Sequence, residues 1–224
     1  WLVAPLGQAL EVTKARLAAF AVTFPAQVRL FVAGRQPQEL LALAAWAAAA
    51  AALAWSLACA AWLRARRPEV LFFPDKSGEH VARLCRDVSS ARRRVWVAMF
   101  TLTNDDLSEA LLRAHGRRVD VRVVVDGAQC EVPGADARRL AEAGVPVTLD
   151  RSWARMHHKF MVLDRAVYSG SFNWTRQASK YNCENLCIMR DAGLVRAFSE
   201  EFERLWAKFG DRGGRLPAGR ARRR

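Results

Sequence analysis

Residues 156–174 read MHHKFMVLDRAVYSGSFNW, and the interpretation of the whole chain depends on this stretch. The runs KFMVLD and AVYSGS are rich in strand formers, and the turn at Asp164 between them favours a hairpin. Alternation along the first strand places His157 and Lys159 on the same side. His158 then faces the opposite side, where a packing or supporting role is the better interpretation. One short segment therefore combines a predicted pair of strands with a cluster of reactive side chains.

Short apolar runs and helical stretches alternate from Pro68 onward, which is typical of an α/β domain. Strands are expected in EVLFF, VWVAMF, VDVRVVVD, VPVTLD and ENLCIMR. Helices are expected in DLSEALLRAHG, ADARRLAEAG and the amphipathic run LVRAFSEEFERLWAKFG. Because the two kinds of element alternate along the chain, we expect helices to cover the faces of one sheet.

Residues 40–63, LLALAAWAAAAAALAWSLACAAWL, contain no charged side chain. A helix of this length crosses the roughly 30 Å hydrocarbon core of a bilayer. The alternative is an alanine-rich helix inside a soluble core, but a soluble helix of this length usually has a polar face. We therefore expect a single transmembrane helix. The arginines that begin at Arg64 place the C-terminal part in the cytosol under the positive-inside rule.

The segments that flank this apolar run differ from it in composition. Residues 1–39 mix basic side chains with apolar runs and are of uncertain structure, either an amphipathic surface helix or part of a leader. Residues 68–209 contain all the expected strands and form the expected catalytic domain. The Gly- and Arg-rich residues 210–224 predict a basic, disordered tail.

The chain is strongly basic, with 35 Lys and Arg against 22 Asp and Glu. This balance favours polyanionic partners such as nucleic acid or an anionic phospholipid surface. The chain has five cysteines, an odd number, and no two of them form a CxxC motif. They predict neither a disulfide framework nor a zinc site, and a reducing compartment is the simpler interpretation.

The polar residues of the opening stretch follow a spacing that extends to Glu184. His157, Lys159 and Asp164 form an H-x-K-x4-D pattern, and a G-S-x-N run at 170–173 begins after five further residues. This arrangement resembles the HKD signature of the phospholipase D superfamily. The resemblance implies a mixed sheet flanked by helices and the cleavage of phosphodiesters.

Imidazole suits phosphodiester cleavage without a metal, because it attacks near neutral pH and also leaves easily. We therefore expect His157 to be the nucleophile, and we expect no metal and no other cofactor. Negative charge develops on the phosphate oxygens during attack. Lys159 and Asn173 are suited to stabilise this charge, with the Ser171 hydroxyl as a neighbouring donor.

Two carboxylates complete the expected catalytic residues. By its place in the family pattern, Glu184 would hydrogen-bond the far nitrogen of His157 and set its tautomer, as an aspartate does in a serine-protease triad. Asp164 is the acidic member of the motif. Because the strand ends at Asp164, a structural role in closing the turn or pairing with a basic neighbour is the better interpretation.

The motif occurs once, whereas the superfamily's mechanism needs one histidine to attack and a second to protonate the leaving oxygen. The stretch VWVAMFTLTNDD offers no second histidine. A two-fold homodimer would bring two copies of His157 into one cleft. We therefore predict a homodimer with its active site on the dimer axis.

Within the superfamily, the chain is similar to the single-motif, membrane-anchored group of mitochondrial cardiolipin hydrolases, also called Zucchini. The similarity covers residues 64–209 and includes EVLFFP, GSFNWT and EEFERLW. Animal members insert a Cys/His zinc module after the first strand, where this chain has only PDKSGEHVARLC, so we expect no structural zinc. The resemblance implies a single-pass protein of the mitochondrial outer membrane.

Two substrate classes stay open at this point. A membrane phospholipid, with cardiolipin cleaved to phosphatidic acid, is favoured by the anchor and the arginines beside it. Single-stranded RNA or DNA, cut by an endonuclease as in piRNA processing, is favoured by the overall basic charge. No aromatic stacking platform is visible in the sequence, because the aromatic residues of the domain mostly follow core-like patterns. An inactive scaffold is disfavoured because the motif residues are intact.

Overall fold

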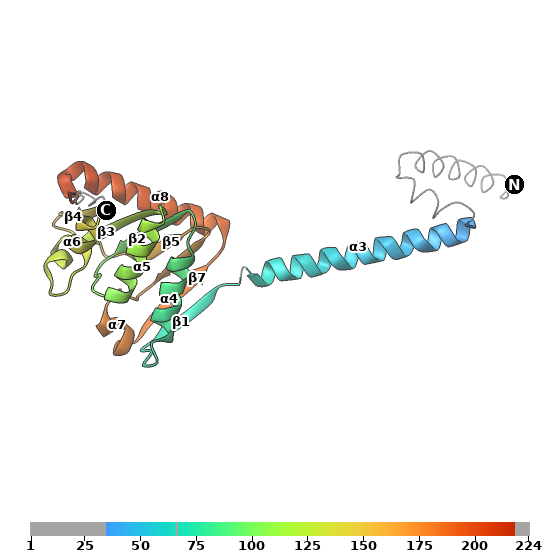
Figure 1. Ribbon diagram of the computed structural model, residues 1–224, viewed down its shortest axis with the longest axis horizontal. Coiled ribbons are helices and arrows are strands. Elements are labelled where there is room, and N and C mark those ends of the chain that lie inside the picture. The colour runs from blue at the N-terminus through green and yellow to red at the C-terminus, as the bar shows by residue number, and fades with distance from the viewer. Residues whose placement is uncertain (1–34, 66, 218–224) are drawn as a thin grey trace. The chain divides into compact units, whose positions relative to one another are not determined.

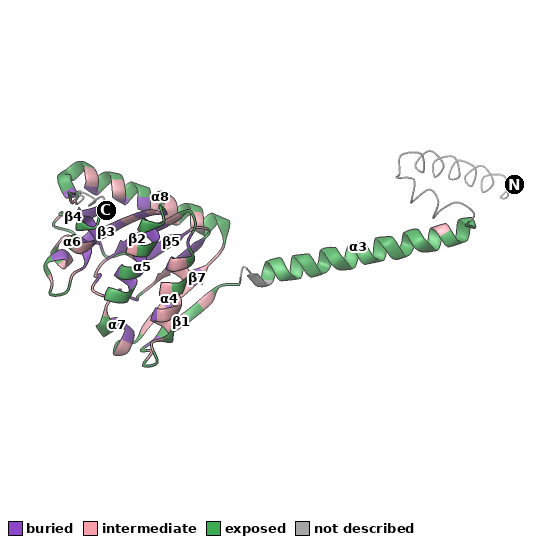
Figure 2. Ribbon diagram, in the orientation of Figure 1, coloured by how far each residue is buried: buried purple, intermediate pink, exposed green. Residues whose placement is uncertain are grey.

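The computed structural model describes residues 35–65 and 67–217, and the chain divides into two compact units after Leu63. Helix α3, Pro37–Ala65, belongs to the first unit, and its Pro37–Leu63 portion is long and apolar enough to cross a membrane. Its side chains are exposed almost throughout (Figure 2), so within the described residues this helix is not the core of a soluble domain. Residues 1–34, which include most of the segment of uncertain structure, lie outside the described residues.

The second unit is an α/β domain in which strands and helices alternate along the chain (Figure 1). The strands are β1 (Glu69–Phe73), β2 (Arg94–Met99), β3 (Asp120–Asp126), β4 (Val147–Asp150), β5 (Lys159–Leu163), β6 (Ala166–Gly170) and β7 (Glu184–Met189). The helices and helical turns are α4 (Glu79–Ser90), α5 (Asp105–Gly116), η1 (Ala128–Glu131), α6 (Ala137–Glu142), α7 (Arg176–Lys180), α8 (Ala192–Phe209) and η2 (Gly210–Gly214).

All seven strands form one mixed sheet in the order β1-β7-β6-β5-β2-β3-β4. Strands β2, β3 and β4 are parallel to one another, and every other neighbouring pair is antiparallel. The expected hairpin of β5 and β6 forms, with Met161 opposite Tyr168. The expected fold class, a mixed α/β sheet flanked by helices, is confirmed.

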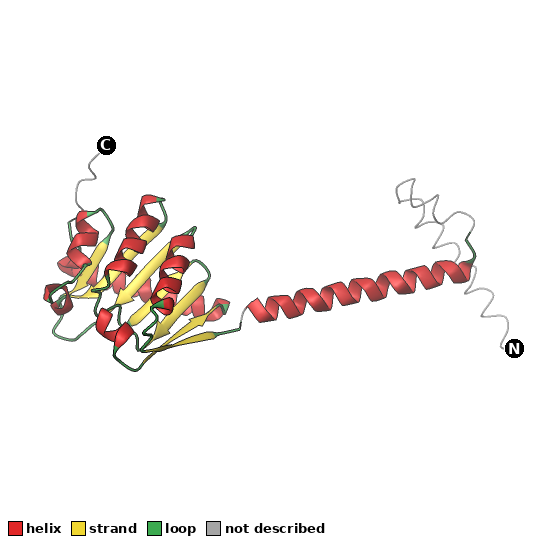
Figure 3. Cartoon of the chain, turned by 60° about the horizontal axis from the view of Figure 1, so that its bottom comes forward, coloured by secondary structure: helices red, strands yellow, loops and turns green. Residues whose placement is uncertain are grey.

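Helices cover both faces of the sheet (Figure 3), and a separate hydrophobic core lies on each face. Helices α4 and α5 lie side by side over one face (Figure 1). Helix α8 crosses the opposite face, where Phe202 and Phe209 share a core with Trp96 of β2 and Phe160 of β5. Strands that are covered on both faces must be apolar in both directions, which explains the continuous apolar run VWVAM.

Two of the helices are absent from the sequence-based expectations. Helix α4 buries only Val81, Leu84 and Val88, a sparse apolar pattern among polar residues. Helix α7 has five residues, too few for a periodic signal, although the Thr175 hydroxyl caps it by accepting the Ala178 N–H at 3.0 Å. Both helices depend on tertiary packing for their stability.

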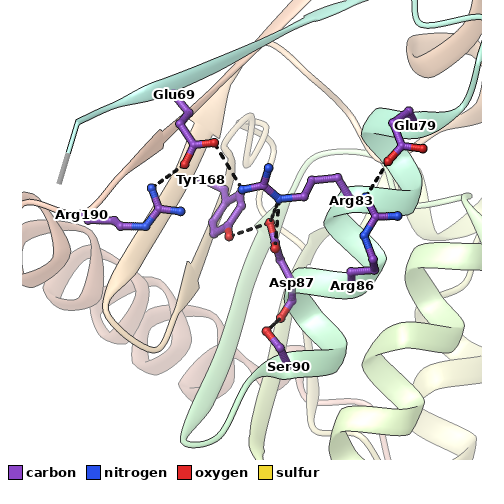
Figure 4. Close-up of polar contacts among 8 residues, drawn as sticks. All are labelled: Glu69, Glu79, Arg83, Arg86, Asp87, Ser90, Tyr168 and Arg190. Atoms are coloured by element: carbon purple, nitrogen blue, oxygen red, sulfur yellow. Dashed lines mark hydrogen bonds and ion pairs between the residues drawn. The ribbon is translucent and has the colours of Figure 1, made fainter. Parts of the chain in front are cut away.

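A polar network joins the edge strand β1 to α4 and to the centre of the sheet (Figure 4). The Glu69 carboxylate accepts hydrogen bonds from Arg83 at 3.3 Å and from Arg190 at 2.7 Å. Arg83 also donates to Asp87, and the buried Tyr168 hydroxyl donates to the same carboxylate at 3.0 Å. Burial and the neighbouring Asp87 carboxylate raise the pKa of Tyr168, which keeps the phenol a neutral donor. The network holds β1 in place at the edge of the sheet.

The chain after α8 differs from the expected disordered tail at 210–224. Gly210–Gly214 forms a π-helical turn, and the Leu216 N–H then donates to the Val147 carbonyl of β4 at 3.0 Å. Gly214 permits this close approach, because a Cβ there would lie 2.2 Å from the Leu149 carbonyl oxygen. Residues 210–217 are therefore ordered against β4, and residues 218–224 lie outside the described part of the chain.

Candidate active site

The cluster of expected catalytic side chains lies at the carboxyl ends of the parallel strands β2 and β3. Lys159 begins β5 opposite Met99, the last residue of β2. His157 lies two residues earlier, in the exposed loop that leads into β5. Asp126 ends β3 at the same edge. In open α/β sheets the carboxyl ends of the strands are where loops present ligand-binding and reactive groups.

His157 and Lys159 meet directly, as strand alternation predicts. Lys159 Nζ lies 3.3 Å from His157 Nε2 and donates to the His157 carbonyl oxygen at 3.0 Å. A lysine ammonium can only donate, so this contact requires Nε2 to be the unprotonated nitrogen of the imidazole. The His157 side chain is exposed. The pair therefore places the unprotonated nitrogen of an exposed imidazole next to a positive charge.

His158 lies on the other face of the sheet, also as alternation predicts. Its Nε2 is 3.1 Å from Glu201 Oε1 of α8, and its ring meets Phe160 edge-on with centroids 5.3 Å apart. These contacts fix the loop against α8 and leave His158 out of the cluster around His157. The expected supporting role fits this placement.

Phe100, the residue after β2, contacts both members of the reactive pair. Its ring centroid lies 4.5 Å from the His157 ring and 4.9 Å from Lys159 Nζ. Its N–H donates to the His158 carbonyl at 2.8 Å, which ties the loop to β2. The face of an aromatic ring attracts cations. Sequence analysis included Phe100 in a strand and missed this contact, because a terminal strand residue looks like any core aromatic.

The electrostatic surroundings favour the neutral form of His157. Burial lowers the pKa of its imidazole, and the positive charges of Lys159 and Arg155 lower it further. Burial also lowers the pKa of Lys159, against the opposing attraction of the Glu184 carboxylate. A histidine whose pKa is below its usual value is unprotonated, and therefore nucleophilic, at neutral pH.

Asp126 supports the loop that carries His157 and was not identified from the sequence. Its Oδ2 accepts the Met156 N–H at 3.2 Å, and its Oδ1 accepts the Ala128 N–H at 3.1 Å. The side chain is 3% exposed. The only signal in the sequence is an acidic residue followed by glycine at the end of the apolar run VVVDG. Asp126 holds the backbone immediately before His157 and so acts as a positioning residue.

The G-S-x-N run carries the chain from β6 toward α7. A Cβ on Gly170 would lie 2.1 Å from the Asn185 carbonyl oxygen, so only glycine fits where β6 approaches β7. The Ser171 hydroxyl accepts the Asn185 N–H at 3.1 Å and is thus bonded to β7. Asn173 Oδ1 accepts the Thr101 N–H at 3.3 Å, and its NH2 group forms no hydrogen bond within the described residues. Asn173 therefore has donors available for a phosphate.

Glu184 begins β7 opposite Phe73, and its Oε1 accepts a hydrogen bond from Asn182 Nδ2 at 3.1 Å. The contacts of the described residues do not include the expected bond between Glu184 and His157. The carboxylate is instead close enough to Lys159 to favour the charged form of that lysine. In this single subunit, Glu184 therefore acts on the lysine of the motif.

Asp164 lies at the end of β5 remote from Lys159, so the structure does not bring it to His157. Its carboxylate accepts the backbone N–H groups of Arg92, Arg93 and Arg94 at 3.0, 2.9 and 3.0 Å, and its own φ is 47°. Burial opposes its ionisation, but these N–H donors outweigh burial and lower the pKa of Asp164. The geometry supports the structural interpretation of this residue.

Three aromatic side chains of the catalytic unit are strongly exposed, and one of them is Phe72 of β1, at 69%. Trp153 is 99% exposed in the loop between β4 and β5, four residues before His157, and Tyr181 is 67% exposed after α7. These three are exceptions to the expectation that the aromatic residues of the domain mostly follow core-like patterns. The sequence did contain a signal for Trp153, which lies in the polar run DRSWAR outside any apolar pattern.

Comparison with known proteins places this site in context. A family model described as a cardiolipin synthase, PLD-like domain matches residues 84–206. The chain is 41% identical over 123 residues to a mitochondrial cardiolipin hydrolase of Chlamydomonas reinhardtii, a match that covers 54% of the chain and 55% of that relative. It is 35% identical over 196 residues to the Mus musculus mitochondrial cardiolipin hydrolase, covering 72% and 89% of the two chains.

Among solved structures, the fold is similar to Nuc from Salmonella typhimurium, a phospholipase D family member. The TM-score is 0.57 at 26% identity, and the match covers 63% of this chain and 95% of Nuc. The chain therefore spans about half the length of the algal relative and nearly all of the bacterial structure.

Proposed function

The chain belongs to the family of phospholipase D-like domains, and from this premise we propose that it is a membrane-anchored phosphodiesterase that hydrolyses cardiolipin to phosphatidic acid. The observation that carries the proposal is the contact of His157 Nε2 with Lys159 Nζ at 3.3 Å, in an exposed loop at the carboxyl edge of the sheet. The names of the algal and mouse relatives point to cardiolipin as the substrate.

In the first step, His157 Nε2 attacks one phosphorus of cardiolipin, and the bond from that phosphorus to the central glycerol oxygen breaks. A phosphatidyl-histidine intermediate forms. Lys159 and the NH2 group of Asn173 stabilise the negative charge on the phosphate oxygens. The lowered pKa of His157 supports this role, because the attacking nitrogen must carry no proton.

A second histidine that carries a proton is needed to protonate the glycerol oxygen that leaves. A homodimer supplies it as another copy of His157, and the mechanism requires one copy to be neutral while the other is protonated. The same imidazole then takes a proton from water, whose oxygen attacks the phosphatidyl-histidine. Phosphatidic acid and phosphatidylglycerol leave, and both histidines return to their starting states. One water is consumed for each cardiolipin cleaved.

The anchor in this proposal is α3, whose Pro37–Leu63 portion has the length and composition of a single span. Arginines follow the span in the sequence, so the catalytic unit faces the cytosol under the positive-inside rule. The relatives are named mitochondrial, which supports placement in the mitochondrial outer membrane. The anchor would hold the basic catalytic unit against anionic head groups.

A second candidate function is endonuclease cleavage of single-stranded nucleic acid. The exposed Trp153 and Tyr181 favour it, because exposed aromatic rings on a basic protein are the usual platform on which unpaired bases stack. The same histidine chemistry would cleave the phosphodiester of RNA or DNA.

The test compares the full chain, wild type and His157→Asn, in EDTA with cardiolipin vesicles and labelled single-stranded RNA side by side. Asparagine retains a polar side chain of similar size and removes the nucleophilic nitrogen. We expect phosphatidic acid release by the wild type and none by the variant. RNA cleavage without lipid hydrolysis would favour the second candidate, and loss of wild-type activity in EDTA would contradict the metal-independent mechanism.

A further inference from the structure

A cavity of about 390 Å³ opens beside the nucleophile, between the β4–β5 loop and the C-terminal half of α8. His157 is one of the residues that line it, together with its neighbours Arg155 and His158. The opposite wall comes from α8, which contributes Arg204 and Lys208, and the loop contributes Arg155. Three cationic side chains therefore line the cavity, together with one carboxylate, that of Asp150.

One of the charged side chains in this wall, Arg204, is already neutralised by an ion pair. Arg204 donates twice to Glu201 at 2.7 Å, and Glu201 also contacts His158 at 3.1 Å. Asp150 is buried, and its Oδ1 accepts the Ser152 N–H at 2.8 Å. Arg204 and Glu201 therefore form an ion pair with each other. The Asp150 carboxylate is hydrogen-bonded to the backbone.

Arg155 and Lys208 keep their charges unpaired. Within 35–65 and 67–217 neither forms an ion pair, and both side chains are exposed. Each is held beside an aromatic ring: the Arg155 guanidinium is 5.8 Å from the Phe100 centroid, and Lys208 Nζ is 5.1 Å from the Phe209 centroid. Unpaired cations on two walls of a cavity attract an anion, and a phosphate can accept from both.

We propose that this cavity binds the second phosphate of cardiolipin while His157 attacks the first, an inference that rests on the proposed function. Cardiolipin carries two phosphates joined through a single glycerol, so its second phosphate must lie next to whatever holds the first. Phospholipids with one phosphate leave Arg155 and Lys208 without a partner. The cavity therefore selects cardiolipin over other membrane lipids.

The test measures binding of two soluble probes, glycerol 1,3-bisphosphate and glycerol 1-phosphate, to the detergent-solubilised full chain by calorimetry. The variants are Arg155→Gln and Lys208→Gln. The matched control is Arg196→Gln, which removes one positive charge from an exposed position of α8 outside the cavity. The readout is the ratio of the two dissociation constants, which does not depend on turnover.

We expect the wild type and Arg196→Gln to prefer the bisphosphate, and each cavity variant to lose about tenfold of that preference, equivalent to about 1.4 kcal/mol. Lys208→Gln should also raise the KM for cardiolipin and leave kcat nearly unchanged. An undiminished preference in both cavity variants would overturn the proposal. The proposal would also be overturned if the cavity variants cleaved single-stranded RNA more slowly but kept the bisphosphate preference. In that case the cavity would bind a phosphate of the nucleic acid. If the preference depends on Arg155 and Lys208 but cardiolipin is not hydrolysed, the subsite stands and the proposed function fails.

Discussion

Replacement of Asp164 separates a structural from a catalytic role for the acidic member of the motif. Its Oδ1 accepts the N–H groups of Arg93 and Arg94, and its Oδ2 accepts that of Arg92. Asn at this position tolerates the left-handed φ of 47° as well as Asp does, and it keeps one acceptor oxygen. Ala keeps no acceptor and is strained at this φ.

The magnitudes follow from counting these bonds. Each is worth about 1 kcal/mol after allowance for partial exposure, and an unfavourable left-handed residue costs about 1 kcal/mol more. Asp164→Asn should therefore lower the free energy of unfolding by about 1.5 kcal/mol, through one lost bond and two weakened ones. Asp164→Ala should lower it by about 4 kcal/mol, through three lost bonds and the strained backbone.

The assay is urea unfolding of the full chain in a mild detergent, followed by near-ultraviolet circular dichroism of the buried tryptophans. Because the folded-state pKa of Asp164 is lowered, its stabilisation is fully present above the unfolded pKa of about 3.9 and is lost as pH falls through the folded value. The gap between wild type and Asp164→Asn should therefore be full at pH 6 and shrink below about pH 4.

The catalytic activity of Asp164→Asn tests whether this residue also takes part in the reaction. Asp164→Asn, assayed well below its melting temperature, should keep kcat within about threefold of wild type, because Asp164 lies at the opposite end of β5 from the reacting groups. Unchanged stability together with a loss of kcat by orders of magnitude would refute the structural interpretation.

Three further predictions concern the packing and protonation of the site. Gly170→Ala should lower the free energy of unfolding, measured in urea, by about 3 kcal/mol or more, because its Cβ would lie 2.1 Å from the Asn185 carbonyl oxygen. A change below about 0.5 kcal/mol would contradict this close approach. Tyr168→Phe removes the buried hydroxyl that donates to the Asp87 carboxylate, so it should lower the free energy of unfolding by about 1–2 kcal/mol and leave kcat unchanged. A large loss of activity with normal stability would show that the tyrosine serves the active site. In a pH series, the acid limb of kcat/KM should have its midpoint below the ordinary histidine pKa of about 6.5. The reason is that burial lowers the pKa of His157 and only the unprotonated imidazole attacks. A midpoint above about 6.5 would contradict this prediction.

The residues that sequence analysis placed correctly are those whose position follows from local geometry. Strand alternation alone puts His157 beside Lys159 and His158 on the opposite face, and the contacts with Lys159 and Glu201 confirm this. The hairpin at Asp164 forms because the flanking runs have strand composition. Hydrophobic periodicity and residue composition are properties of a short segment, so they predict local structure without knowledge of the fold.

The features that sequence analysis missed depend on partners far apart in the chain. Asp126 supports the His157 loop from a strand about 30 residues earlier, and Phe100 does so from almost 60 residues away. The order of residues 210–217 likewise requires β4 to accept the returning chain. Glu184 was expected to hydrogen-bond His157, but it accepts a hydrogen bond from Asn182 instead. None of these pairings leaves a signal in local periodicity.

The proposed mechanism requires a covalent phosphatidyl intermediate on His157, and this intermediate can be trapped. The full chain is mixed with cardiolipin in EDTA, quenched within one turnover under alkaline conditions that preserve phosphohistidine, and digested for mass spectrometry. We expect a phosphatidyl adduct on the peptide that contains His157 and none in His157→Asn. Cardiolipin turnover with the adduct on another residue, or turnover retained in His157→Asn, would contradict it.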